Sequence, residues 1–266
     1  MYTSTSAHSK VSRLRQQQLS ILKNVVAICQ RHNLIYFLDG GTLAGALMYN
    51  GFGIYDDDID ISMPREDFEK FISICQDELS QDNYLDYYTT NSNYYLTFAK
   101  VKNRTVNYPE KDREIQDYSH VFIDIFPLDG MKKKEGMRTI TTMFLNDVIK
   151  NMIFMRNSTK KKRKIKALYS FFLQFIKTRH LFRIYYFLFT RENDAKYYIN
   201  HGGRRKETKN QVIQKELYVP AKEHYFVDNY YSIPRQSEDI INTFGFGYME
   251  RYRDKKTFSH IEIERL

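Results

Sequence analysis

Residues 36–65 decide the fold, and they read YFLDGGTLAGALMYNGFGIYDDDIDISMPR. Four of the five residues from 56 to 60 are aspartates, and charges this close repel one another unless something cancels them. Alternate side chains of a strand share one face, so Asp58 and Asp60 should point the same way while the isoleucines beside them face a core. Two such carboxylates suit a hard divalent cation such as Mg²⁺. The segment therefore predicts a site for phosphoryl transfer.

Two other interpretations of the aspartates remain open. One is a solvated acidic loop with no ligand. The other is an EF-hand, which fits poorly: if Asp56 takes the first position, Ile61 stands where the turn glycine belongs and Asp67 where the bidentate glutamate belongs.

The residues before the aspartates predict a strand, a glycine turn and a helix. We expect a strand over residues 34–38 and a helix from Thr42 to Met48 that packs against the sheet. Gly40 and Gly41, between them, would let backbone N–H groups of the turn and of Thr42 approach a phosphate without a side-chain clash. A plain tight turn is the alternative.

A second acidic position lies further along the chain. Residues 122–126 are apolar on both faces, which predicts a central strand, yet Asp124 interrupts them. A carboxylate inside a buried strand costs several kcal/mol unless it is neutralised or coordinated. A structural salt bridge would neutralise it, but a third metal or base carboxylate beside Asp58 and Asp60 explains it better. Asp129, in the following PLDG, is expected to serve a turn.

These motifs together resemble a known family. The runs GGTLAGAL, GFGIYDDDIDISMPREDFEKF and FIDIFPLDG are similar to those of the LicD family, which has the nucleotidyltransferase fold and includes bacterial phosphorylcholine transferases and fukutin-related enzymes. The resemblance is dense from about residue 34 to 130, thin between 131 and 209, and returns weakly near 216–260. It implies an α+β fold with a mixed sheet flanked by helices.

The resemblance also implies a division of the chain and an activity. Residues 1–130 would form the catalytic core, 131–209 a basic helical insertion, and 210–266 a segment that completes the core. Family members cleave a CDP-linked alcohol and move its phospho-alcohol half onto a sugar hydroxyl. The expected reaction is therefore transfer of phosphocholine from CDP-choline onto a cell-surface glycan such as lipopolysaccharide, teichoic acid or capsule.

Roles for individual acids follow from the resemblance. Asp58 and Asp60 would hold one or two Mg²⁺ (or Mn²⁺) ions that clamp the diphosphate. Asp124 would share a metal and deprotonate or orient the acceptor hydroxyl. Two alternatives stay open: a nucleotidyltransferase that acts on a small molecule or a protein from an NTP, and a non-catalytic adaptor at a membrane surface.

Four further residues are candidates for substrate binding. Lys100 and Lys102 alternate onto one face of a strand, where they would offset a phosphate or simply face solvent. Arg65 matches the family and would bind a phosphate or hold the local carboxylates apart. His260 corresponds to a family histidine near the C-terminus.

The chain departs from the family pattern at two places. Residues 46–49 read ALMY where the family usually has Ala-Val-Arg-His, and Tyr55 replaces a tryptophan. The arginine that Met48 replaces would be a cation close to the site, so the family's usual donor or acceptor does not simply carry over.

The positive charge of the chain is concentrated in the insertion. Net charge is +9, and between Asp147 and Glu192 there are 12 Lys or Arg residues and no acid. We expect helices over about 139–156 and 164–190, with aromatic and basic side chains interleaved. Such helices suit peripheral contact with an anionic membrane through residues 156–191, or an ordinary helical lid. Nucleic-acid binding is not expected, because no DNA or RNA module motif is present.

Composition places the protein in a reducing compartment. The two cysteines, Cys29 and Cys75, fall on apolar helix faces and are expected to be buried thiols, which does not suggest a disulfide framework. No signal-peptide core and no run of 18 apolar residues is present. The expected location is cytoplasmic, with peripheral association at the inner face of the cytoplasmic membrane as the alternative.

Overall fold

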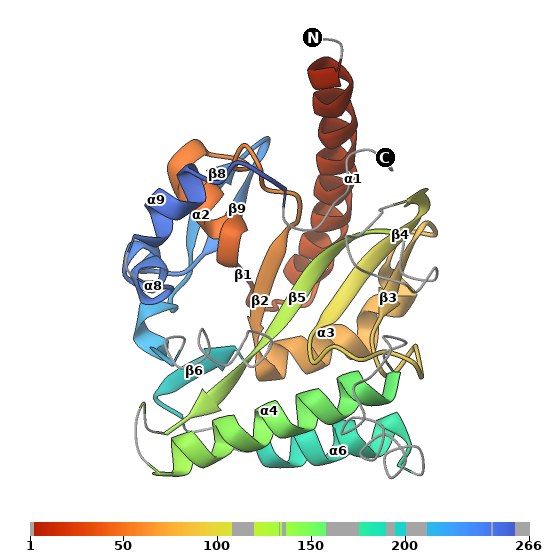
Figure 1. Cartoon of the computed structure of the whole chain (residues 1–266), viewed down its shortest axis with the longest axis vertical. Helices are drawn as coiled ribbons and strands as arrows, with labels where there is room; N and C mark the ends of the chain where they lie inside the picture. The colour runs from red at the N-terminus through yellow and green to blue at the C-terminus, as the bar shows by residue number, and fades with distance from the viewer. Residues whose placement is uncertain are drawn as a thin grey trace.

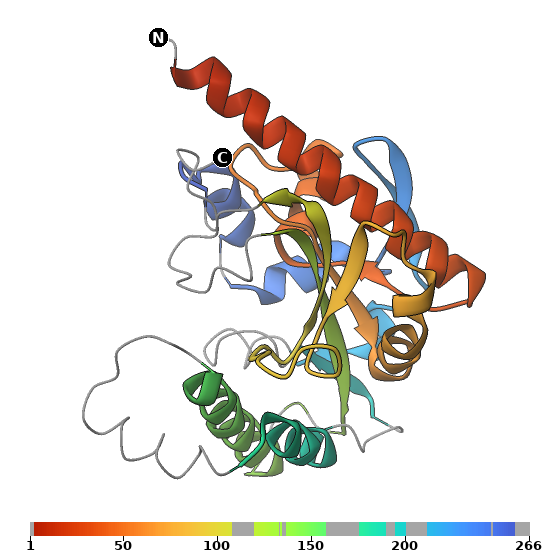
Figure 2. The ribbon, with the colours of Figure 1, turned by 90° about the vertical axis from the view of Figure 1, so that its right-hand side faces the viewer.

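A computed structural model of the chain is shown in Figures 1 and 2. The residues that it describes are 3–107, 120–132, 134, 137–157, 176–189, 195–200, 212–245 and 247–258.

A mixed seven-stranded sheet forms the centre of the molecule. Five strands lie in the spatial order β1 (Phe37–Leu38), β2 (Asp60–Pro64), β5 (His120–Met131), β4 (Ala99–Asn107) and β3 (Asn83–Asp86). The far end of β5 also pairs with β6 (Tyr197–Asn200), which pairs with β7 (Ile213–Gln214). Among the strands that the structure describes in this sheet, β2 and β5 run parallel to each other and the other pairings are antiparallel. The predicted α+β class and the central position of residues 122–126 are confirmed.

Two helices cover one face of this sheet. Helix α1 (Thr3–Arg31) crosses β4 and β5, and α3 (Arg65–Glu78) packs on β2 and β5 (Figure 2). Ile59 and Ile61 of the aspartate segment are fully buried, as the predicted alternation requires. Cys29 and Cys75 are also buried and free, and burial raises the pKa of each thiol to about 12, so both stay protonated.

The C-terminal part of the chain returns to the N-terminal part. Helix α2 (Gly40–Tyr49) is contacted by α8, by α9 and by the hairpin strand β8, and β1 is contacted by β9. These elements span η3 (Lys215–Leu217), β8 (Lys222–Phe226), β9 (Asn229–Ile233), α8 (Ser237–Thr243) and α9 (Tyr248–Arg253). Figure 1 shows them beside α2, so segments that are distant in sequence meet at one end of the sheet.

In the described part of the insertion, helices α4 (Met137–Asn157) and α6 (Thr178–Phe189) pack on each other at the lower edge of the molecule in Figure 1. Helix α4 agrees with the predicted 139–156. Of the second predicted helix, 164–190, residues 176–189 are described and are helical from Thr178 onward; 164–175 lie outside the described residues.

Several features differ from the sequence expectations. The strand expected over residues 34–38 is limited to Phe37–Leu38, and β2 begins at Asp60, so Asp58 lies before the strand on which it was expected. Strand β6 lies inside the range expected to be helical, because four residues are too few to show a period. Strand β5 continues through Asp129, where a turn was predicted. Pairing with β6, in which Asp129 faces Ile199, keeps this stretch extended.

Candidate active site

A row of charged side chains crosses the sheet on the face opposite α1 and α3. Asp60 of β2 lies directly opposite Asp124 of β5, and Asp124 lies opposite Lys100 of β4. Side chains of directly paired residues share a face, so these three groups adjoin one another. Asp39 continues the row past β2, since its N–H donates to the carbonyl of Asp60 at 3.0 Å. The structure therefore brings two of the three predicted acids into adjacent positions.

The carboxylate of Asp60 has a strongly raised pKa. Burial raises its pKa well above the ordinary value, and the charges of Asp58 and Asp124 raise it further. Within the described part of the chain its carboxylate accepts no hydrogen bond, while its backbone N–H donates to Thr42 Oγ1 at 2.9 Å. Asp56, close by, has a pKa raised to about 7 by burial and by Asp58. A bound cation would relieve this repulsion.

The buried cation of the row is already paired. Lys100 Nζ lies 2.6 Å from Asp124 Oδ1, and it also lies 3.2 Å from the centre of the Phe122 ring. Lys102 is buried too, with its Nζ 2.7 Å from Asp86 Oδ2. Neither lysine faces solvent, and the salt bridge considered for Asp124 is present.

Gly40 and Gly41 allow the start of α2 to lie close to the carboxylates of Asp60 and Asp56. Gly40 adopts φ +53, and a Cβ there would lie 2.8 Å from Asp60 Oδ2. At Gly41 a Cβ would lie 3.0 Å from Asp56 Oδ1. Asp39 caps the helix, accepting a hydrogen bond from Gly40 N at 2.8 Å. A side chain at Gly40 would clash with the Asp60 carboxylate in a strained backbone conformation, and one at Gly41 would require the Asp56 carboxylate to shift slightly.

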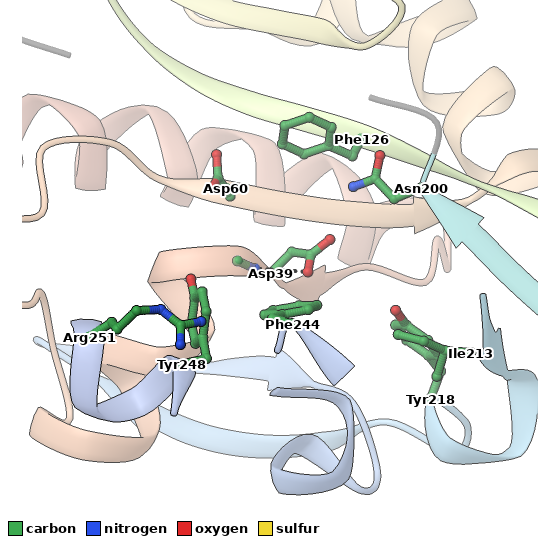
Figure 3. Close-up of a pocket in the computed structure, with 10 residues that line it drawn as sticks. Asp39, Asp60, Phe126, Asn200, Ile213, Tyr218, Phe244, Tyr248 and Arg251 are labelled. Atoms are coloured by element: carbon green, nitrogen blue, oxygen red, sulfur yellow. Dashed lines mark hydrogen bonds between the residues drawn. The ribbon is translucent and has the colours of Figure 1, made fainter. Parts of the chain in front are cut away.

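A cavity of about 410 Å³ opens beside Asp60 (Figure 3). Its walls come from the sheet on one side and from the C-terminal helices on the other. The lining residues are Asp39, Gly40, Asp60, Phe126, Asn200, Ile213, Tyr218, Phe244, Tyr248 and Arg251. Asp60 is thus the predicted acid that faces a space large enough for a substrate group.

Part of the chain is similar in sequence to known proteins. Residues 33–157 match the family model described as LicD/FKTN/FKRP, nucleotidyltransferase domain. The match covers 125 of the 266 residues, and this part of the chain resembles the LicD family. A curated relative from Haemophilus influenzae, named lipopolysaccharide cholinephosphotransferase LicD, is 35% identical over 129 residues, which cover 44% of this chain and 45% of the relative. An uncharacterized protein of Rickettsia typhi is 27% identical over 116 residues, covering 43% of this chain and 35% of that protein. The chain thus spans less than half the length of either relative.

Arg65, which was predicted to bind substrate, instead forms an ion pair with Asp129. Its guanidinium donates to both carboxylate oxygens of Asp129, at 2.6 and 2.8 Å, and lies 5.0 Å from the centre of the Tyr186 ring on α6. Arg65 is buried and does not line the cavity. Arg65 therefore links the start of α3 to β5 and to α6. His260 lies outside the described residues.

The aspartate loop is held by residues that sequence reasoning missed. Tyr252 of α9 donates its hydroxyl to Asp56 Oδ2 at 3.0 Å and accepts a hydrogen bond from Gly53 N at 3.0 Å. From α1, Arg15 donates to the carbonyls of Gly53 and Asp56, both at 2.6 Å. The loop is therefore fixed by both ends of the chain.

Arg251, Tyr248 and Phe244 were also missed as cavity residues. Phe244 and Tyr248 are the two ends of the Gly-aromatic run at 244–248, and Arg251 follows it, in the segment that was expected to complete the core. That run was the available signal, but it gave no individual roles. These residues reach the cavity because α9 packs against α2, a contact that the sequence does not predict.

The carboxylates of the site are candidate ligands for a metal ion. Among the described residues, no group of three or more His, Cys, Asp or Glu side chains is arranged to hold a metal. Mg²⁺, however, is usually bound by one or two carboxylates together with water and substrate phosphates. Asp60, whose pKa is raised by burial and then by the charge of Asp58, fits that requirement together with Asp58. Asp124 would have to share its carboxylate between a metal and Lys100.

Proposed function

We propose that the protein transfers phosphocholine from CDP-choline onto a sugar of lipopolysaccharide or a related surface glycan, with help from a divalent metal ion. The observation that carries the proposal is the position of Asp60, which faces a cavity and whose pKa is raised by burial and then by its acidic neighbours. The likeness to a named cholinephosphotransferase supports the transferred group and the acceptor class.

Asp58 and Asp60 would hold the metal ion. When bound, Mg²⁺ would offset the negative charge of the diphosphate, which is the main electrostatic requirement of phosphoryl transfer. The same ion would cancel the repulsion that raises the pKa of Asp60.

Arg251 and Asp124 would act on the two reacting partners. Arg251 lines the cavity and its guanidinium suits bidentate binding of a phosphate. Asp124 would accept the proton of the sugar hydroxyl, or orient that hydroxyl, as its oxygen attacks the phosphorus that carries choline. The bond from that phosphorus to the CMP oxygen breaks, and CMP leaves with the electron pair.

The reaction is tested by measuring CMP release from CDP-choline with Mg²⁺ and extracted lipopolysaccharide. Release should require the glycan and should stop when EDTA removes the metal. Release of pyrophosphate from an NTP, without CMP from CDP-choline, would instead support the nucleotidyltransferase alternative. Release that continues in EDTA would overturn the metal role.

We also propose that the insertion rests on an anionic lipid surface, where a lipid-linked acceptor is found. The exposed face of α4 carries apolar side chains at helical spacing: Met137, Ile140, Phe144 and Val148. On α6, Ile184 and Phe187 are exposed beside the exposed Arg179 and Arg183. Apolar groups among cations match an anionic bilayer interface. None of the described helices is long and apolar enough to cross a membrane.

Replacing Phe144 and Phe187 by Ser should weaken vesicle binding about tenfold or more, because each buried aromatic ring contributes about 1.5–3 kcal/mol. The measurement is co-sedimentation with phosphatidylglycerol vesicles at low and high salt. Tyr230→Ser on β9 is the control, since this exposed ring lies outside the insertion. Binding by the unchanged protein should fall with salt. Equal binding to neutral vesicles would contradict an electrostatic contact.

A further inference from the structure

Aromatic rings line a large share of the cavity beside Asp60. Phe244 and Tyr248 lie with their ring centres 5.2 Å apart and their planes at 77°, so they form a corner rather than a parallel slot. Phe126 from the sheet and Tyr218 also face this space (Figure 3). Rings that meet at a corner can present their faces to a single rounded group from several sides.

Charged side chains of both signs line the cavity. As viewed in Figure 3, Arg251 lies at one end and Tyr218 at the other, with Asp39 above Phe244 between them. The carboxylate of Asp39 is buried and lines the cavity, as does that of Asp60. A ligand with an anionic end near Arg251 and a cationic end among the rings would complement this arrangement.

We propose that the aromatic corner formed by Phe244 and Tyr248 binds a quaternary ammonium group, the trimethylammonium head of the phosphocholine unit. This inference rests on the proposed function and names the part of the site that selects the transferred group. Ring faces attract a cation electrostatically, and a quaternary ammonium has no N–H groups that would lose hydrogen bonds on leaving water.

The carboxylate of Asp39 favours a cation over a neutral base in this cavity. Asp39 is not a proposed metal ligand; it lies above Phe244 in Figure 3 and lines the same cavity as Tyr248. A cytosine base would gain from a slot between parallel rings, which Phe244 and Tyr248 do not form. A primary ammonium would bind less well, because its N–H groups find only ring faces in this corner.

The test is calorimetric binding of phosphocholine, phosphoethanolamine and CMP to the whole protein. Phosphocholine should bind at least about tenfold tighter than phosphoethanolamine. Tyr248→Leu and Phe244→Leu should each weaken phosphocholine binding about tenfold and leave CMP binding unchanged, whereas Tyr248→Phe should retain phosphocholine binding. Tyr230→Leu, the same change on an exposed ring of β9, is the control.

A ligand that lacks only the positive charge gives a test that does not depend on the variants. The phosphate ester of 3,3-dimethylbutanol has the shape of phosphocholine but carries no cation, and it should bind the unchanged protein about tenfold more weakly. Equal binding of the two esters would overturn the proposal. So would loss of CMP binding in Tyr248→Leu, which would assign the corner to the base.

Failure of this inference and failure of the proposed function give different results. Ring-dependent phosphocholine binding without CMP release from CDP-choline would keep the ammonium site and remove the transfer reaction. Normal CMP release with phosphocholine binding that is unaffected by both leucine variants would keep the reaction and remove the ammonium site.

Discussion

Asp60→Asn is expected to abolish CMP release while making the metal-free protein more stable. The carboxylate of Asp60 faces the cavity among Asp39, Asp58 and Asp124, and these neighbours raise its pKa after burial does. An amide of the same size removes a charge that is repelled in the folded state. It also removes a metal ligand, and loss of several kcal/mol of charge stabilisation lowers the rate by about 100-fold or more.

Both effects are measurable on one preparation. In EDTA the melting temperature of Asp60→Asn should exceed that of the unchanged protein, by about 2–4 °C for each kcal/mol of repulsion removed. Added Mg²⁺ should raise the melting temperature of the unchanged protein and not that of the variant, since only the former would bind the ion at this site. Asp77→Asn, on the exposed surface of α3, is the matched control. A variant that is less stable in EDTA and still active would contradict the role of Asp60.

Local patterns were sufficient to predict the strand that carries the site. The alternation of side chains along a strand was enough to predict that Asp60 points away from the core in which Ile59 and Ile61 are buried, because the side-chain period of a strand is two. Likewise, an apolar run interrupted by Asp124 indicated a central strand with a special acid. The α+β class followed from these elements and from the family resemblance.

Contacts between distant segments were not predictable in the same way. Lys100 was placed on the correct face, but its burial and its pairing with Asp124 depend on strand order, which no local pattern encodes. Arg251 and Tyr252 reach the site from about 190 residues away because α9 packs on α2. Arg65 matched the family, yet its partner Asp129 became available only because β6 keeps that stretch extended.

Lys100→Met is expected to be the most destabilising of these single changes. Lys100 is 1% exposed, and its ammonium is shared between Asp124 and the face of Phe122. Methionine fits a similar volume but leaves Asp124 as an uncompensated buried charge. Breaking a buried ion pair in this way costs about 3–5 kcal/mol of unfolding free energy. Replacing both members, Lys100→Met with Asp124→Leu, should recover much of the loss, because no charge is then stranded.

Urea unfolding of the single and double variants measures these costs, with Lys222→Met, an exposed strand lysine of β8, as the control. Adding Mg²⁺ to Lys100→Met separates the two roles proposed for Asp124. If Asp124 shares the metal, the ion replaces the lost ammonium and restores part of the stability beyond its effect on the unchanged protein. If Asp124 serves only the salt bridge, Mg²⁺ stabilises both proteins equally. A cost no larger than that of Lys222→Met would show that the Lys100–Asp124 pair does not hold the sheet together.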